Sequence, residues 1–214
     1  HLFKSQRLIH AGDLPCPAEK LSMLHCAIET LQNAGYIYIG MDHFAKPDDN
    51  LVLAQQHGKL QRNFQGYSTH SNCDLLAVGV SSISMIDNVY VQNARDLNSY
   101  QQKMDMGLLP VTKGFTLNQE DLLRRFVING LICYCELSFH EITRLFDINP
   151  RQHFQHELQQ LQPMLDDGLV AIDNNGIKIL NKGRLLIRRV CMVFDEYLPQ
   201  AESKEHSIRY SKII

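Results

Sequence analysis

The sequence lacks any excess of charge of one sign and any long apolar run. Its 214 residues carry 21 Lys and Arg against 23 Asp and Glu, which gives a formal net charge of -2. A chain with this balance has no general attraction to nucleic acid or to an anionic membrane. No apolar run approaches the roughly 20 residues that a membrane-spanning helix needs. We therefore expect no nucleic-acid partner and no membrane partner.

The cysteines and histidines lack the spacing of a metal site. The six cysteines are Cys16, Cys26, Cys73, Cys133, Cys135 and Cys191. None of them form C-x-x-C or C-x-x-x-C-x-x-C, and no G-x-G-x-x-G or Walker loop is present either. Cys133 and Cys135 would face different sides of a helix, which suits neither a disulfide nor a shared metal. We expect reduced thiols in a cytoplasmic protein, no metal ligands in this chain, and solvated side chains for His153 and His156.

The first residues also lack the features of a processed or initiating N-terminus. His1–Arg7 resembles neither a signal peptide nor an initiator start, and amphipathic sequence follows directly. We expect a piece of a longer protein. The length allows one large domain or two small ones, and a 44% hydrophobic content supports a sizeable core.

What the sequence does contain is an apolar strand that opens into polar side chains. Tyr36–Met41 is β-prone and is followed at once by Asp42 and His43. In parallel sheets and barrels, chemistry gathers at the carboxyl ends of strands, so both residues are candidates for a site. The alternative is that they only hydrogen-bond loop backbone. A predicted helix, 18–33, precedes the strand, and this order predicts a parallel partner strand from outside the chain.

The segment 47–109 is predicted to mix helices and strands around one aromatic loop. A helix opens at Pro47–Asn50, and 59–69 has the composition of a loop. In that loop, Phe64 and Gln65 could hold an adenine-like ring by stacking and edge bonding, or Phe64 could be a buried core residue. The remaining elements expected here are strands at 74–86 and 88–93 and a helix at 97–106.

A composition shift at 109–114 indicates a second domain with a winged-helix-like layout. Thr116 is expected to cap a long helix, 117–135, with Gln119 completing a capping box. The elements expected after it are a helix following Ser138, a helix at 151–166, a hairpin around Asn175–Gly176, and a helix at 182–198 capped by Asn181.

This layout raises DNA binding as an alternative, which the charges disfavour. Between Gly114 and Gln200, eleven acidic residues stand against nine basic ones, and Asp173 stands at the hairpin tip, where a DNA-binding wing would need a base. Arg184, Arg188 and Arg189 form a basic cluster that we interpret as a solvated helix face. The alternative is that they contact carboxylates or a partner.

Several long motifs, in the same order, resemble oxygen-independent coproporphyrinogen III oxidases, which are radical S-adenosylmethionine enzymes. The motifs are Ile39–Asp49, Arg62–Tyr67, Gly79–Ile86, Asp167–Val170 and Lys182–Arg188. The resemblance implies an α/β (α+β) fold. Residues 1–109 would be the C-terminal part of a partial (β/α) radical S-adenosylmethionine barrel, and 110–214 a helical, winged-helix-like domain.

The same resemblance implies a function and a set of site residues. These oxidoreductases convert two propionates of coproporphyrinogen III to vinyl groups in heme synthesis, using S-adenosylmethionine and a [4Fe-4S] cluster. Carried over to this sequence, Phe64, Gln65 and Ile83 match positions that bind S-adenosylmethionine, and Asp42 and His43 match a motif that bounds the cavity. No catalytic residue is assigned.

The chain departs from the family in lacking the C-x-x-x-C-x-x-C cluster motif. Three thiolates are needed to hold that cluster, so we expect the chain to be inactive alone although its parent is an enzyme. We expect a monomeric parent and, at the exposed apolar edge of the strand Tyr36–Met41, either self-association of this chain or rearrangement of that region. A related heme-binding chaperone, which carries heme and has no oxidase activity, is the alternative within the superfamily.

Overall fold

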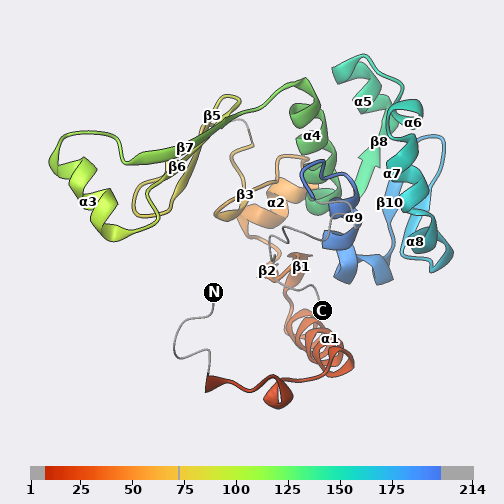
Figure 1. The fold of residues 1–214 in the computed structure, drawn as a ribbon. Helices are drawn as coiled ribbons and strands as arrows, with labels where there is room; N and C mark the ends of the chain where they lie inside the picture. Colours follow the sequence, from red (N-terminus) through yellow and green to blue (C-terminus); the bar gives the residue numbers. More distant parts are fainter. Residues whose placement is uncertain (1–7, 72, 199–214) are drawn as a thin grey trace.

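The computed structural model describes residues 8–71 and 73–198, and it combines helices with small antiparallel sheets. Figure 1 shows α4 (Gln119–Tyr134) near the centre, with the later helices on one side and a long arm of three strands on the other. Within the described residues, no helix is both long enough and apolar enough to cross a membrane.

The predicted strand is present, and within the described residues it has a partner that was not predicted. After η2 (Ala11–Asp13), the first elements are α1 (Pro17–Asn33), β1 (Ile37–Gly40), β2 (His43–Ala45) and α2 (Asn50–Gln56). Among the described residues β1 pairs only with β2, and the pairing is antiparallel; the parallel partner expected from outside the chain stays a prediction. A turn at Met41–Asp42 brings the chain straight back along the strand, which the apolar pattern of β1 could not reveal.

The edge of β1 is covered by side chains. Tyr38 is 6% exposed and Ile39 only 1%, so the prediction of an exposed apolar edge here is wrong. The carbonyl of Tyr38 accepts a hydrogen bond from Arg184 at 2.9 Å, and that of Ile39 accepts one from Gln55 at 3.0 Å. Arg184 is therefore not part of a solvated face, since its guanidinium also lies 5.0 Å from the ring centre of Tyr38. Self-association of the chain stays a prediction.

The segment predicted as a loop forms a hairpin. β3 (Gln61–Asn63) and β4 (Gly66–Ser68) pair in register, and Phe64 and Gln65 form the two-residue tip. The Asn63 side chain accepts a hydrogen bond from the backbone N–H of Gln65 at 2.8 Å, which closes the turn. Such short polar strands lack the apolar alternation that identifies a strand in sequence.

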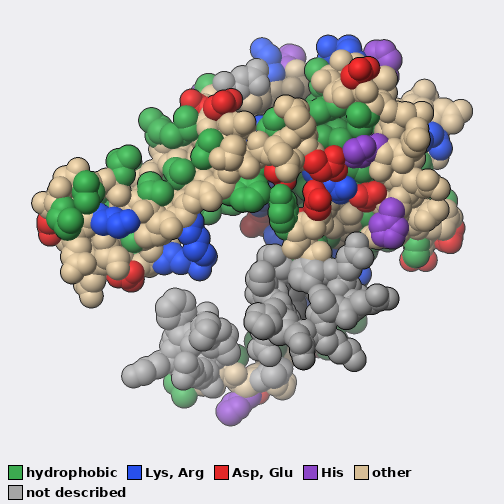
Figure 2. Space-filling view, turned by 45° about the horizontal axis from the view of Figure 1, so that its top comes forward, with side chains coloured by type: hydrophobic (Ala, Val, Ile, Leu, Met, Phe, Trp, Pro, Cys, Tyr) green, Lys and Arg blue, Asp and Glu red, His purple; other side chains and the backbone are tan. Residues whose placement is uncertain are grey.

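A three-stranded arm follows. β5 (Ile83–Ile86), β6 (Val89–Asn93) and β7 (Val111–Thr116) form an antiparallel sheet, and α3 (Leu97–Asp105) lies between β6 and β7 in the chain. The strand predicted at 74–86 is shorter than expected, and before β5 only Leu75 bridges to Met85. Figure 2 shows apolar side chains spread over this arm, at the left of the view. The exposed ones on α3 and the loops around it include Leu97, Met104, Met106, Leu108 and Leu109.

The boundary proposed between 109 and 110 stays a prediction. β7 begins just after it and pairs with β6, so the sheet joins residues from both sides of that boundary. The long helix α4 starts only after Thr116.

Helix α4 begins at a different cap from the one predicted. Asn118 is the N-cap: its side chain accepts from the Asp121 N–H at 2.9 Å, and the Asp121 carboxylate accepts from the Asn118 N–H at 2.8 Å. Thr116 remains in β7, so its assignment as the cap was wrong. Both stretches have a cap residue followed by a suitable partner, and the pairing of β7 decides between them.

The remaining C-terminal elements follow the predicted order with two corrections. Ser138 caps α5 (Phe139–Phe146), as predicted. The single helix expected at 151–166 is three short ones, α6 (Pro150–His153), α7 (Gln155–Gln160) and α8 (Gln162–Asp166). Pro163 lies in the first turn of α8, where it lacks the N–H that a continuous helix would use. The helix expected at 182–198 is η3 (Asn181–Leu186) followed by α9 (Ile187–Val193).

The predicted hairpin, β9 (Val170–Ile172) and β10 (Gly176–Ile179), gains a third strand, β8 (Glu136–Ser138). Helix and hairpin backbones meet closely at Gly183, where an added Cβ would lie 2.1 Å from the Leu169 carbonyl oxygen. Because Gly183 has no side chain, the start of η3 can lie directly against the sheet.

Two cores hold the molecule together. The larger one joins α4 to the elements that follow it, and its fully buried members include Val127, Leu131, Ile142, Leu161 and Val190. The smaller one consists of Ile39, Ala45, Val52, Ala54, Leu60 and Cys133. Because Cys133 lies on α4, that helix contributes to both cores.

Candidate functional site

The two hairpins bring the predicted strand-end residues next to the predicted aromatic turn. Nδ1 of His43 lies 2.8 Å from the Asp42 carboxylate. Nε2 of the same ring lies 3.2 Å from the position that a Cβ on Gly66 would occupy. Asp42 and His43 therefore bond to each other, and the alternative in which they bond only loop backbone is wrong. An ionised carboxylate only accepts, so Nδ1 of His43 carries the donated proton.

Tyr67 anchors this arrangement to α4. Its hydroxyl donates to the Ile132 carbonyl at 3.1 Å, and its ring meets the His43 ring edge-on with centroids 5.0 Å apart. Burial raises the pKa of Tyr67, so the hydroxyl stays a donor at neutral pH. On the other side, the Arg62 guanidinium lies 5.5 Å from the Tyr67 ring centre. The base of the β3–β4 hairpin is thus fixed, while its tip extends outward.

The tip presents an aromatic ring and an amide. Phe64 is 59% exposed, so it is not the buried core residue that one alternative proposed. Its ring meets that of Tyr90 at 88° with centroids 5.4 Å apart. Gln65 is exposed beside it. An exposed ring next to a free amide suits stacking on a flat heterocycle together with hydrogen bonds to its edge.

Tyr90 links this tip to Ile83. In the β5–β6 pair, Met85 lies opposite Tyr90 and Ile83 opposite Gln92. Opposite residues share a face and side chains alternate along a strand, so Ile83 and Tyr90 lie on the same face of the arm. Phe64 packs against that face through Tyr90. The structure therefore gathers Asp42, His43, Phe64 and Gln65 around one hairpin and places Ile83 on the adjoining sheet.

Sequence reasoning did not identify three residues of this arrangement as site residues, namely Arg62, Tyr67 and Tyr90. Arg62 and Tyr67 flank the Phe64–Gly66 turn in the sequence, and this proximity was the available signal. The contact of Tyr90 with Phe64 depends on the placement of the arm, which no local pattern encodes.

The other polar candidates have structural partners. His153, predicted to be solvated, is exposed, and its Nε2 lies 2.9 Å from the Glu120 carboxylate. Arg124 pairs with Glu120 on the same helix at 2.6 Å and joins α4 to α7 through Glu157 at 2.8 Å. Within the described residues, no three His, Cys, Asp or Glu side chains are grouped to hold a metal ion.

The buried thiols are poor metal ligands and poor nucleophiles. Burial raises the pKa of Cys133 to about 12 and that of Cys191 to about 12. Both thiols are therefore neutral at physiological pH.

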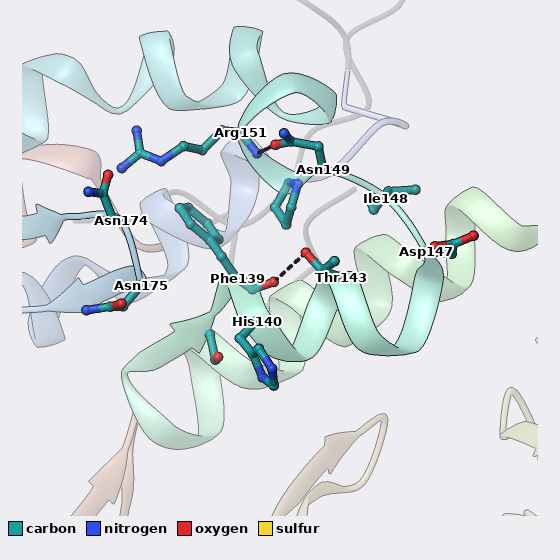
Figure 3. Close-up of a pocket in the computed structure, with 11 residues that line it drawn as sticks. Phe139, His140, Thr143, Asp147, Ile148, Asn149, Arg151, Asn174 and Asn175 are labelled. Carbon is teal, nitrogen blue, oxygen red and sulfur yellow. Dashed lines mark hydrogen bonds between the residues drawn. The ribbon is translucent and has the colours of Figure 1, made fainter.

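A hollow of about 600 Å³ lies elsewhere, between α5, the start of α6 and the tip of the β9–β10 hairpin. Figure 3 shows Phe139 and Thr143 at its centre, with Arg151 and Asn174 on one side and Asp147 on the other. Arg151 donates to the Asp173 carbonyl, so its guanidinium is already engaged. None of the five predicted site residues lines this hollow, and we do not assign the site to it.

Comparison with known proteins gives a family match and several relatives of this chain. The family described as the HemN C-terminal domain matches residues 117–186. The oxygen-independent coproporphyrinogen III oxidase of Pseudomonas aeruginosa is 49% identical over 212 residues, which cover 99% of this chain and 45% of that protein. The enzyme of the same name from Salmonella typhimurium is 46% identical over 213 residues, 100% of this chain and 46% of that protein.

A solved structure agrees with these relatives. The work describing it is titled "Coproporphyrinogen III oxidase (HemN) from Escherichia coli is a Radical SAM enzyme". It superposes with a TM-score of 0.86 at 46% identity, covering 92% of this chain and 45% of that one. The resemblance predicted from the motifs and the predicted fold class are both confirmed. The chain spans about half the length of the curated relatives it matches.

Proposed function

We propose that this chain is the C-terminal part of an oxygen-independent coproporphyrinogen III oxidase, a radical S-adenosylmethionine enzyme. The observation that supports this most strongly is identity of 49% across 99% of the chain to a relative with that name. The relatives' name favours an oxidase over a heme-carrying chaperone. DNA binding loses support as well, because Arg184 and Arg151 are engaged by backbone carbonyls within the protein.

The reaction proposed for the parent is the oxidative decarboxylation of two propionates of coproporphyrinogen III, giving protoporphyrinogen IX in heme synthesis. S-adenosylmethionine supplies the hydrogen-abstracting radical in this family. A monomeric cytoplasmic parent, with no nucleic-acid or membrane partner, completes the proposal.

The residues present fit S-adenosylmethionine. Phe64 offers an exposed ring for the adenine, Gln65 an amide for its edge, and Ile83 an apolar wall on the neighbouring strand. Asp42 and His43 would bound the cavity behind the turn. In this arrangement the chain orients the adenosyl group and excludes water from one side of it.

The residues present do not fit the [4Fe-4S] cluster. Cys133 and Cys191 are buried with raised pKa values, and the cysteines have no cluster spacing. We therefore propose that the cluster is held outside this chain and that these 214 residues are inactive alone. Reconstitution with iron and sulfide should give no stoichiometric [4Fe-4S] spectrum and no cleavage of S-adenosylmethionine. A full cluster signal with cleavage would refute the proposal.

Binding of S-adenosylmethionine tests the site in the parent enzyme. Phe64→Ala should raise the dissociation constant for S-adenosylmethionine about tenfold, since stacking on an aromatic ring contributes about 1–3 kcal/mol per base. Leu109→Ala is the matched control, because Leu109 is 82% exposed and lies just before β7 on the arm, outside the β3–β4 turn that carries Phe64. Equal affinities for the two variants would remove Phe64 from the site.

A further inference from the structure

The His43 ring fills the space that a side chain at position 66 would need. An added Cβ on Gly66 would lie 3.2 Å from Nε2 and 3.7 Å from Cε1 of His43. The first distance is shorter than ordinary van der Waals contact, so the ring occupies the space beside Gly66 that a side chain there would need. Gly66 also has a φ of 118°, which residues with a side chain rarely adopt. His43 therefore packs against the residue that ends the Phe64–Gln65 turn.

The ring is held in this place from two further directions. The Asp42 carboxylate accepts from Nδ1 at 2.8 Å and fixes the rotation of the ring. Tyr67 meets it edge-on, and the Tyr67 hydroxyl is itself bonded to the Ile132 carbonyl of α4. The His43 ring, on the β1–β2 hairpin, therefore packs against the β3–β4 hairpin. Tyr67 connects this contact to α4.

We propose that His43 is a positioning residue, whose ring sets the conformation of the turn that carries Phe64 and Gln65. This inference rests on the proposed function, in which that turn borders S-adenosylmethionine. Neither the exposed Phe64 ring nor the exposed Gln65 amide is buried in a core. Beyond the contact of Phe64 with Tyr90, their orientation depends on the base of the turn, where the His43 ring lies beside Gly66. Asp42 acts one step further back, through the ring that it orients.

The experiment uses the full-length enzyme with its cluster reconstituted. His43→Ala removes the ring and should raise the KM for S-adenosylmethionine about tenfold, the factor that a loss of about 1.4 kcal/mol of binding free energy gives, with little change in kcat. His43→Phe keeps a ring in the same space without the bond to Asp42 and should restore most of the affinity. His57→Ala, at an exposed histidine that ends α2, is the control and should behave as wild type.

A double substitution tests the contact itself. Gly66→Ala adds the Cβ that meets Nε2 and also strains the backbone, so it should raise the KM strongly. In His43→Ala/Gly66→Ala the ring is gone and only the backbone strain remains. The double variant should therefore bind S-adenosylmethionine severalfold better than the product of the two single effects predicts.

The outcomes separate this inference from the proposed function. Iron content and the spectrum of the reduced cluster show that each variant is folded and loaded. If His43→Ala leaves the KM at the wild-type value in a loaded enzyme, or if the two substitutions have simply multiplicative effects, the positioning role is wrong. If the wild-type enzyme itself fails to bind and cleave S-adenosylmethionine, the proposed function fails instead.

Discussion

The two halves of the molecule differ in how they are stabilised. From α4 onward, helices and a three-stranded sheet enclose a single continuous core with several fully buried side chains. Before α4, a small core lies under the β1–β2 hairpin, and the arm exposes large apolar side chains such as Leu97 and Leu109. Exposed apolar surface of this extent is typical of regions that contact other parts of a protein.

The first half of the molecule depends on the second half for the stability of its core. Cys133 supplies part of the small core from the end of α4, and Tyr134 packs against that core from the same turn. Gln55 crosses between the halves by donating to both the Ile39 and the Cys133 carbonyls, the latter at 2.7 Å. The C-terminal unit, which is α4 and the elements after it, therefore stabilises the β1–β2 hairpin and the small core beneath it.

Producing the two halves as separate proteins tests this dependence and should give the largest effect on stability. Residues 117–198 produced alone should unfold cooperatively in urea, because they keep the whole larger core. Residues 8–116 produced alone should show no cooperative transition, because they lose the α4 residues of the small core. Circular dichroism and amide proton dispersion distinguish the two. Cooperative unfolding of the N-terminal piece would contradict the comparison.

A core truncation should affect the C-terminal unit strongly. Leu131 is fully buried on α4, so Leu131→Ala should lower the free energy of unfolding by about 3 kcal/mol through lost burial and a cavity. Leu109→Ala, on the exposed arm, should change it by no more than about 0.5 kcal/mol. Denaturant titrations of the two variants give both values. Similar losses would mean that the arm is as well packed as the core.

The two buried thiols compare the two cores directly, since Cys133 belongs to the small core and Cys191 to the large one. Burial raises the pKa of each to about 12. The unfolded chain loses these protons near pH 9 while the folded chain keeps them, so stability falls as the pH rises from 9 towards 12. Each thiol contributes up to about 1.4 kcal/mol per pH unit in that window.

Thiol labelling at pH 8 sharpens this comparison. In variants that retain only one of the two cysteines, Cys133 should react roughly tenfold faster than Cys191, because the smaller core opens more readily. The exposed Cys16 should react at once in either background. Equal protection of the two buried thiols would show that both cores open together.

Substitution of the N-cap of α4, where the two halves meet, should have the smallest effect on stability. Asn118→Ala removes one side of the reciprocal cap with Asp121 and should lower the free energy of unfolding by about 1 kcal/mol. Thr116→Ala is the matched control and should have an effect below about 0.5 kcal/mol. A larger loss of stability in Thr116→Ala than in Asn118→Ala would support Thr116 as the helix cap, as predicted from the sequence.

The sequence predicted the C-terminal half better than the first half, for a physical reason. The Ser138 cap and the Asn175–Gly176 hairpin are local signals, and both were confirmed. The breaks at Phe154 and Pro163 were missed, because the periodic apolar pattern continues across them.

In the first half, pairing depends on contacts between distant segments. The antiparallel partner of β1 and the β3–β4 hairpin follow from turns that place polar residues in short strands. The candidate site residues were assigned from motifs and stay a prediction, whereas the geometry that relates them could not be predicted from the sequence. The contact of His43 with Gly66 joins two hairpins, and that of Phe64 with Tyr90 joins a hairpin to the arm.

The hydrogen bond from Arg184 to the Tyr38 carbonyl has a consequence for synthesis of the chain. The two residues are separated by 146 positions, so the carbonyl emerges from the ribosome long before its donor. At about 5–20 residues per second, the delay is roughly 7–30 s. During that interval the strand lacks one of the side chains that cover its edge in the finished fold. The edge of β1 is therefore completed only after η3 has been made.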